Sequence, residues 1–173
     1  ENWNRPEAEV NDLMGLLRFH LRGEIKYLSE KGVRFRAIGD RERLAPDIVT
    51  LIEDVEERTA SNTRLSLTVA LSYGGRSEIS HAARQLAQQV KDGTLEPEDI
   101  SETLFEQSLY TADIPDPDLL IRTSGEQRIS NFLLWQLAYA EFVFIDKHWP
   151  DFSKEDFESA VREFQTRDRR YGT

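Results

Sequence analysis

The chain has 173 residues, enough for one domain with a sizeable core, and its 39% hydrophobic and 31% charged content is ordinary for a soluble globular protein. Its formal net charge of −10, with no long basic run, argues against general nucleic-acid binding. There is no cysteine, which excludes disulfides and thiolate metal sites, and no apolar run approaches the roughly 18 residues of a membrane span.

Hydrophobic periodicity predicts alternating helices and strands in the first half of the chain. Apolar residues at helical spacing predict a helix over residues 7–31, and Gly32 is a plausible end to it. A strand follows over residues 33–38. Pro46 begins a second helix, and residues 65–73 form the strongest strand pattern in the chain.

The second half continues the alternation. The pattern predicts a helix over residues 77–91, a short helical segment after Pro97, a strand over 119–122, a helix from about residue 130, a strand over 142–145, and a last helix capped by Ser153. Strands separated by helices favour a mostly parallel central sheet covered by helices. The sequence therefore predicts a single α/β domain.

The run from residue 115 to 152 carries the strongest functional signal. The predicted strand over residues 119–122 ends at Arg122 and leads into the polar turn Thr123-Ser124-Gly125-Glu126, which Arg128, Ser130 and Asn131 follow just before a predicted helix start. Guanidinium groups, hydroxyls, a glycine and the N–H groups of a helix N-terminus are anion-binding groups. This junction predicts a phosphate or diphosphate site.

The opening segment, residues 1–6, holds a second constellation. An amide, an indole and a guanidinium (Asn2, Trp3 and Arg5) stand just ahead of a helix that starts after a proline. One interpretation is a helix start with an anchoring tryptophan. The other is a second anion site at a helix N-terminus.

Other polar residues have structural and functional interpretations side by side. Glu141, before the predicted strand over residues 142–145, is either solvated, paired with an arginine, or functional. Glu126 lies between Arg122 and Arg128, where a carboxylate can orient both guanidinium groups. The turn Tyr73-Gly74-Gly75-Arg76 is first a turn device, in which only Arg76 is a candidate for an anion contact. Three acidic residues interrupted by prolines read as a loop: Asp113, Asp116 and Asp118.

The chain resembles a known family at two of these places. The pattern R-x-x-G-E-x-R-x-S-N, at residues 122–131, and the pattern E-N-W-x-R-P, at residues 1–6, are both similar to motifs of the cis-prenyltransferases, specifically the bacterial undecaprenyl diphosphate synthases. A third family motif, D-G-N-x-R-W-A, is absent from these residues. The resemblance implies that residues 1–173 are the C-terminal two-thirds of one cis-prenyltransferase domain.

The resemblance also implies roles for individual residues. Asn2 is the implied catalytic residue, which positions isopentenyl diphosphate, because a neutral amide is a poor general base. The implied metal ligand for Mg²⁺ is Glu141. Glu126 and Asn131 have supporting roles. The implied substrate-binding residues are Trp3, Arg5, Arg122, Arg128, Ile129 and Ser130.

The implied reaction joins isopentenyl diphosphate to an allylic diphosphate, with farnesyl diphosphate as starter and undecaprenyl diphosphate, a cell-wall lipid carrier, as product. The helix over residues 7–31 has apolar residues on more than one face, which fits either burial between layers or the lining of a hydrophobic tunnel, and the resemblance favours the tunnel. The resemblance further implies a cytoplasmic homodimer, peripheral contact with the inner face of the membrane through the product, and a C-terminal segment, residues 167–172, that reaches the neighbouring subunit. The alternative is a non-catalytic, diphosphate-binding subunit of a heteromeric prenyltransferase.

Overall fold

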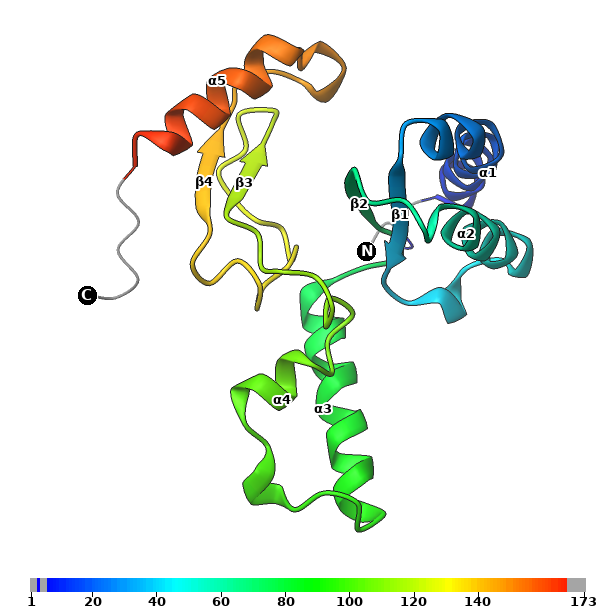
Figure 1. Ribbon diagram of the computed structural model, residues 1–173, viewed down its shortest axis with the longest axis vertical. Helices are drawn as coiled ribbons and strands as arrows, with labels where there is room; N and C mark the ends of the chain where they lie inside the picture. The colour runs from blue at the N-terminus through cyan, green and yellow to red at the C-terminus, as the bar shows by residue number, and fades with distance from the viewer. Residues whose placement is uncertain (1–2, 4–5, 168–173) are drawn as a thin grey trace. The chain divides into compact units, whose positions relative to one another are not determined.

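A computed structural model describes Trp3 and residues 6–167 (Figure 1). Asn2, Arg5 and residues 168–173 lie outside the described residues. The chain divides into two compact units, residues 1–74 and 75–173. That both belong to one domain stays a prediction.

In the first unit, two helices pack on a pair of parallel strands. Strand β1 (Val33–Ile38) pairs with β2 (Leu65–Ala70) from Val33 opposite Leu65 to Ile38 opposite Ala70. Helix α2 (Pro46–Thr59) begins with proline in its first turn, as the sequence predicts, and lies between the two strands in the chain. The parallel arrangement requires such a crossover, because a tight hairpin joins only antiparallel strands.

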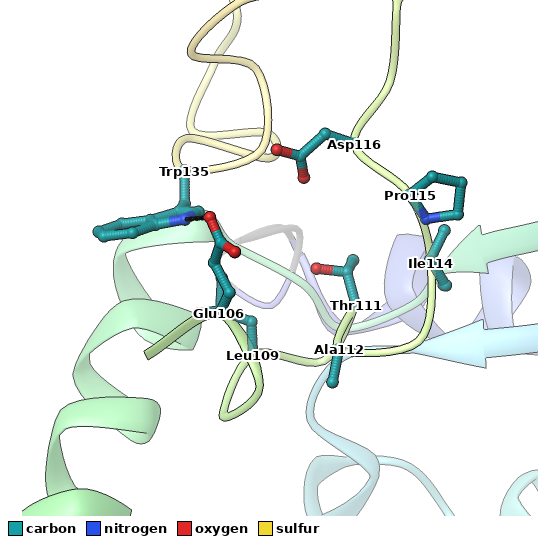
Figure 2. Close-up of a pocket in the computed structure, with 8 residues that line it drawn as sticks. All are labelled: Glu106, Leu109, Thr111, Ala112, Ile114, Pro115, Asp116 and Trp135. Carbon is teal, nitrogen blue, oxygen red and sulfur yellow. Dashed lines mark hydrogen bonds between the residues drawn. The ribbon is translucent and has the colours of Figure 1, made fainter. Parts of the chain in front are cut away.

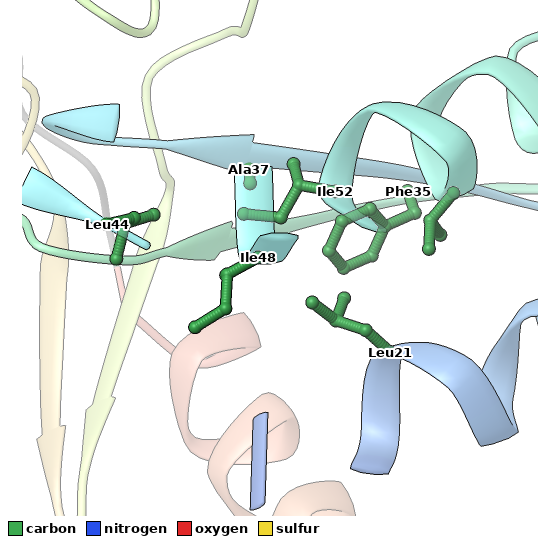
Figure 3. Packing of buried hydrophobic residues seen from close by; sticks show 7 residues of the cluster. Leu21, Phe35, Ala37, Leu44, Ile48 and Ile52 are labelled. Carbon is green, nitrogen blue, oxygen red and sulfur yellow. The ribbon is translucent and has the colours of Figure 1, made fainter. Parts of the chain in front are cut away.

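Helix α1 (Glu7–Glu30) and α2 close a core over β1. Figure 3 shows this core, whose buried members are Leu21, Phe35, Ala37, Leu44, Ile48, Ile52 and Val55. Ile48 and Ile52, one helical turn apart on α2, are both 0% exposed. Leu16 and Phe19 of α1 are 56% and 72% exposed, so this helix does carry a second apolar face. A tunnel lined by that face stays a prediction.

The second unit contains α3 (Gly75–Lys91), the short α4 (Glu102–Glu106), β3 (Leu119–Arg122), β4 (Glu141–Phe144) and α5 (Lys154–Gln165). Short 3₁₀ helices lie between some elements of both units. The first unit contains η2 (Arg41–Arg43), and the second unit contains η3 (Pro97–Asp99) and η4 (Trp149–Asp151). β3 and β4 are parallel, in register from Leu119 opposite Glu141 to Arg122 opposite Phe144. The α/β class and the parallel pairing predicted from the sequence are confirmed.

The helix predicted from about residue 130 is wrong. Residues 130–139 form turns, and the backbone φ angles of Ser130, Asn131 and Leu133 are +47°, +62° and +46°. A right-handed helix needs φ near −63°, so these three residues exclude one. The apolar run Phe132–Leu134 satisfied the helical pattern, but this segment instead turns back onto the start of α3, where Gly75 N–H donates to Asn131 O over 2.7 Å.

Asp156 holds the start of α5 together. Its carboxylate accepts hydrogen bonds from the Lys147 ammonium (2.7 Å) and from the backbone N–H of Ser153 (2.9 Å). The Ser153 hydroxyl in turn accepts from Asp156 N–H, which completes the capping box expected at this serine. The Lys147 ammonium, with help from the Ser153 N–H, lowers the pKa of Asp156 from 3.8 to about 2.

This pKa shift predicts a pH-dependent contribution to stability. A carboxyl whose pKa is depressed by folding stabilises the folded state above its unfolded pKa, and this stabilisation is lost as the pH falls from 3.8 to about 2. The Asp156→Asn variant should therefore melt at a lower temperature than the parent chain at pH 6, and the difference should shrink as the pH approaches 2. A difference in melting temperature that is the same throughout this range would contradict the assignment.

Candidate functional site

The polar turn after β3 is anchored to the chain that follows β4. Ser124 N–H donates to Lys147 O over 2.6 Å, and Gly125 N–H donates to Ile145 O over 3.1 Å. Gly125 has a φ of +65°, and a Cβ placed there would lie 2.8 Å from the Asp146 carboxylate. The positive φ favours glycine here, whereas the Asp146 carboxylate, at the end of a flexible side chain, can move aside. The N–H groups of Ser124 and Gly125 are thus used within the fold.

The next backbone N–H groups are not used in this way. Among the described residues, no hydrogen-bond acceptor faces the N–H groups of residues 126–130, which we call the amide run. Gln127, Arg128 and Ser130 within it are exposed. Successive unpaired N–H groups favour an anionic ligand, because the ligand supplies the acceptors that the fold withholds.

Two arginines flank this part of the turn. Arg128, whose side chain is 65% exposed, forms an ion pair with Glu126, so the structure places the expected orienting carboxylate beside this arginine. Arg122 is half-buried at the end of β3, and no carboxylate among the described residues pairs with it. The Arg122 guanidinium keeps its donors available to a ligand. Ile129 is half-buried between Arg128 and Ser130.

Asn131 connects the same turn to α3. Its backbone carbonyl accepts from Gly75 N–H over 2.7 Å, and its side-chain oxygen accepts from Arg76 N–H over 2.9 Å. Both donors belong to the first turn of α3, whose N–H groups have no partner within the helix. Gly75, at the start of α3, therefore lies against the segment that follows the amide run.

Trp3 belongs to the other unit and has structural contacts there. Its indole N–H donates to the Ser72 hydroxyl over 3.0 Å, the Arg43 guanidinium lies 5.2 Å from its ring, and it packs against the core of that unit. Because its N–H is occupied and Arg43 lies over its ring, only the remaining exposed part of the half-buried Trp3 ring is available for a substrate contact. Asn2 and Arg5, the other candidates of this motif, lie outside the described residues.

Glu141 lies at the other end of the strand pair from Arg122. It is opposite Leu119, whereas Arg122 is opposite Phe144, and this spacing amounts to roughly 10 Å at about 3.3 Å per residue. The Glu141 carboxylate accepts from Arg167 over 2.8 Å, and Arg167 also pairs with Glu163. These two carboxylates raise the pKa of Arg167. The described residues contain no group of three side chains able to hold a metal ion.

The comparisons with known proteins agree with one another. A family model described as "Putative undecaprenyl diphosphate synthase" matches residues 1–172. The isoprenyl transferase of Zymomonas mobilis is 52% identical over 99% of this chain, and the chain covers 69% of its length. The chain belongs to the cis-prenyltransferase family. The isoprenyl transferase of Agrobacterium fabrum is 50% identical, and the chain covers 70% of its length.

A solved structure confirms the fold of this cis-prenyltransferase. The lavandulyl diphosphate synthase of Lavandula x intermedia, crystallised with dimethylallyl diphosphate, is 42% identical, with a TM-score of 0.95 over 99% of this chain and 75% of that one. Together, the relatives establish that the protein is an enzyme of the isoprenyl transferase class. In the part of the chain that the structure describes, no helix is both long and apolar enough to cross a membrane.

A separate pocket of about 260 Å³ lies in the second unit, beside α4. Figure 2 shows its lining: Glu106, Leu109, Thr111, Ala112, Ile114, Pro115, Asp116 and Trp135. The Trp135 indole N–H donates to Glu106 over 3.3 Å. Burial, and then the charge of Glu106, raise the pKa of Asp116. Two carboxylates repel a diphosphate, so this pocket is not a candidate site for a prenyl donor.

The contact of Asn131 with α3 and the anchoring of Ser124 and Gly125 could not be foreseen from the residues alone. The available signal was indirect. A glycine pair at the start of a helix is typical of a turn, but it is equally typical of a place where another segment approaches the backbone closely.

Proposed function

We propose that this cis-prenyltransferase condenses isopentenyl diphosphate with an allylic diphosphate, using farnesyl diphosphate as starter and releasing a long-chain Z-polyprenyl diphosphate. The amide run is the observation that carries this proposal, because it offers unpaired donors next to Arg122 and Arg128. The product we propose is undecaprenyl diphosphate, a lipid carrier for cell-wall precursors. The family model described as "Putative undecaprenyl diphosphate synthase", which matches residues 1–172, supports this product class.

The reaction makes one carbon–carbon bond. The allylic C1–O bond breaks and the diphosphate leaves, C1 joins the terminal alkene carbon of isopentenyl diphosphate, and a proton leaves the neighbouring carbon. The amide run and Arg122 bind the diphosphate of isopentenyl diphosphate, and Ser130 adds a hydroxyl donor. Ile129, half-buried between Arg128 and Ser130, contributes its backbone N–H as part of the amide run. Glu126 restrains the Arg128 guanidinium. Donors fixed before the substrate arrives stabilise charge without reorganising during the reaction.

The residues of the opening motif complete this proposal. Asn2 positions isopentenyl diphosphate for loss of the proton, and Arg5 contacts a phosphate. Trp3 offers the exposed part of its ring, because its N–H is bound to Ser72. The exposed Leu16 and Phe19 of α1 supply apolar surface for the growing chain.

We propose Mg²⁺ as the cofactor and a homodimer as the working unit. Mg²⁺ is usually bound by one or two carboxylates together with substrate phosphates, and when bound it offsets the charge of a departing diphosphate. Glu141 lies three residues along the strand pair from Arg122, so we assign it to the Mg²⁺ of the departing allylic diphosphate and not to the diphosphate that Arg122 binds. We propose that the site is shared and that Glu141 of each copy serves the site of the neighbouring copy. Arg167, bonded to Glu141, also begins the C-terminal segment proposed to reach the neighbour.

The substrates are water-soluble diphosphates, so we place the enzyme in the cytoplasm. A long polyprenyl product is strongly apolar, since each buried CH₂ contributes about 0.8 kcal/mol to its transfer out of water. Contact with the inner face of the membrane is therefore peripheral and occurs through the product.

The Arg122→Ala variant should bind isopentenyl diphosphate about 2–3 kcal/mol more weakly, roughly 30- to 150-fold, because a hydrogen-bonded charge contact is lost. Titration calorimetry on the folded protein measures this directly. Arg84→Ala is the matched control: Arg84 is exposed on α3, no ion pair with it is found among the described residues, and its loss changes the net charge equally. Equal affinities for Arg122→Ala and Arg84→Ala would refute the assigned site.

The shared-site proposal predicts complementation between inactive subunits. Arg122→Ala and Glu141→Gln homodimers should each be nearly inactive. After the subunits are mixed and exchanged, about one quarter of the original activity should return, because half of the dimers then contain one site with both residues intact. If Glu141 serves the site of its own chain, mixing will restore nothing. Glu163→Gln, which removes the other carboxylate partner of Arg167, is the control. The Glu163→Gln homodimer should be active without being mixed with another variant.

A further inference from the structure

We propose that Asn131 is a positioning residue that fixes the amide run against the N-terminus of α3 and thereby sets the affinity for isopentenyl diphosphate. This inference rests on the proposed function and adds to it a residue that acts through the backbone around it. Asn131 differs in this respect from Arg122, which we expect to touch the substrate itself.

The first support is the pair of hydrogen bonds from one residue to one helix end. The two oxygens of Asn131 accept from the consecutive N–H groups of Gly75 and Arg76, over 2.7 Å and 2.9 Å. An asparagine oxygen is among the best acceptors for the free N–H groups of a helix start. Here the cap comes from a residue distant in the sequence, so it also joins two segments of the chain.

The second support is the close packing at this junction. Gly75 is buried, and a Cβ placed on it would lie 2.8 Å from the Leu134 Cγ and 3.0 Å from the Leu134 backbone nitrogen. The segment from residue 131 to 134 therefore lies directly on the backbone of α3. Asn131 itself has a φ of +62°, a conformation that asparagine tolerates better than most residues.

The third support is where Asn131 lies in the chain. The amide run, residues 126–130, has a fixed point at each end. Ser124 and Gly125 are bonded to the backbone that follows β4, and Asn131 is bonded to α3. A segment held at both ends does not need to be ordered when the ligand binds, so less conformational entropy is lost. Loss of the Asn131 side-chain oxygen leaves the bond from Gly75 N–H to the Asn131 carbonyl but weakens this fixed point, which should weaken binding while every phosphate-contacting group is still present.

A direct contact between the Asn131 amide and the diphosphate is the competing explanation, and substitution by aspartate separates the two. Aspartate keeps an oxygen acceptor for Arg76 N–H and is an equally good helix cap. It has no N–H group to donate to a phosphate, and because its added negative charge repels the diphosphate, all variants and the parent are compared at about 1 M salt, where that repulsion is screened. A positioning role therefore survives Asn131→Asp, whereas a donor role does not.

The test compares Asn131→Ala, Asn131→Asp and the parent enzyme in the full-length protein, by KM for both substrates and by calorimetric titration with isopentenyl diphosphate. Asn131→Ala should raise KM and Kd for isopentenyl diphosphate roughly 10-fold, which is the size of effect expected when one side-chain cap hydrogen bond is lost. KM for farnesyl diphosphate should stay within about twofold, and Asn131→Asp should restore most of the affinity.

Asn62→Ala is the matched control, because the Asn62 amide donates to the Val33 carbonyl over 2.9 Å in the other unit and its loss removes one comparable structural hydrogen bond. It should leave KM unchanged. If Asn131→Ala does not fold, Gly75→Ala displaces the same segment from the other side and should raise KM in the same way.

Two results would overturn the inference alone: unchanged affinity in Asn131→Ala, or an Asn131→Asp variant as weak as Asn131→Ala. A parent enzyme that binds no isopentenyl diphosphate would overturn the proposed function, and the inference with it.

Discussion

The candidate site depends on a short stretch of backbone whose N–H groups the fold leaves without acceptors. Folded chains pair nearly all such groups, and an unpaired one is tolerated where water or a ligand completes it. Here the turn after β3 is bonded to its surroundings at Gly125 and again at Asn131, and among the described residues the N–H groups of the amide run between these two points have no protein acceptor. The glycine at 125, the turn in place of a helix after residue 130, and the capping of α3 all serve this arrangement.

The net charge of the protein is negative, which is unfavourable for binding a diphosphate, so the positive charge that binds it must be gathered locally. A chain with a net charge of −10 repels an anion at a distance. At the turn, Arg122 has no carboxylate partner among the described residues, while Glu126 restrains Arg128. The pocket beside α4 shows the contrast, because Glu106 and Asp116 face each other there and burial strengthens their repulsion. We therefore assign the diphosphate of isopentenyl diphosphate to this turn and not to the pocket.

Features set by neighbouring residues could be predicted from the sequence. The strand at residues 33–38, the helix that begins at Pro46 and the cap at Ser153 depend on local patterns and were found where expected. The prediction of a helix from residue 130 was wrong, because the apolar run at residues 132–134 packs against the start of α3. This contact with a distant part of the chain overrides the local pattern. The position of Glu141 could not be foreseen either. Its distance from Arg122 follows from the register of β3 and β4, and a strand pattern does not fix register.

The central claim is that this chain uses its amide run and Arg122 to add isopentenyl units to an allylic diphosphate. The most direct test is incorporation of labelled isopentenyl diphosphate into farnesyl diphosphate by the full-length protein, with and without Mg²⁺, and with the products separated by length. We expect Mg²⁺-dependent incorporation and a ladder of products that ends near one long chain length. A folded protein that binds the diphosphate but incorporates no label would instead be a diphosphate-binding subunit, and the proposed reaction would be wrong.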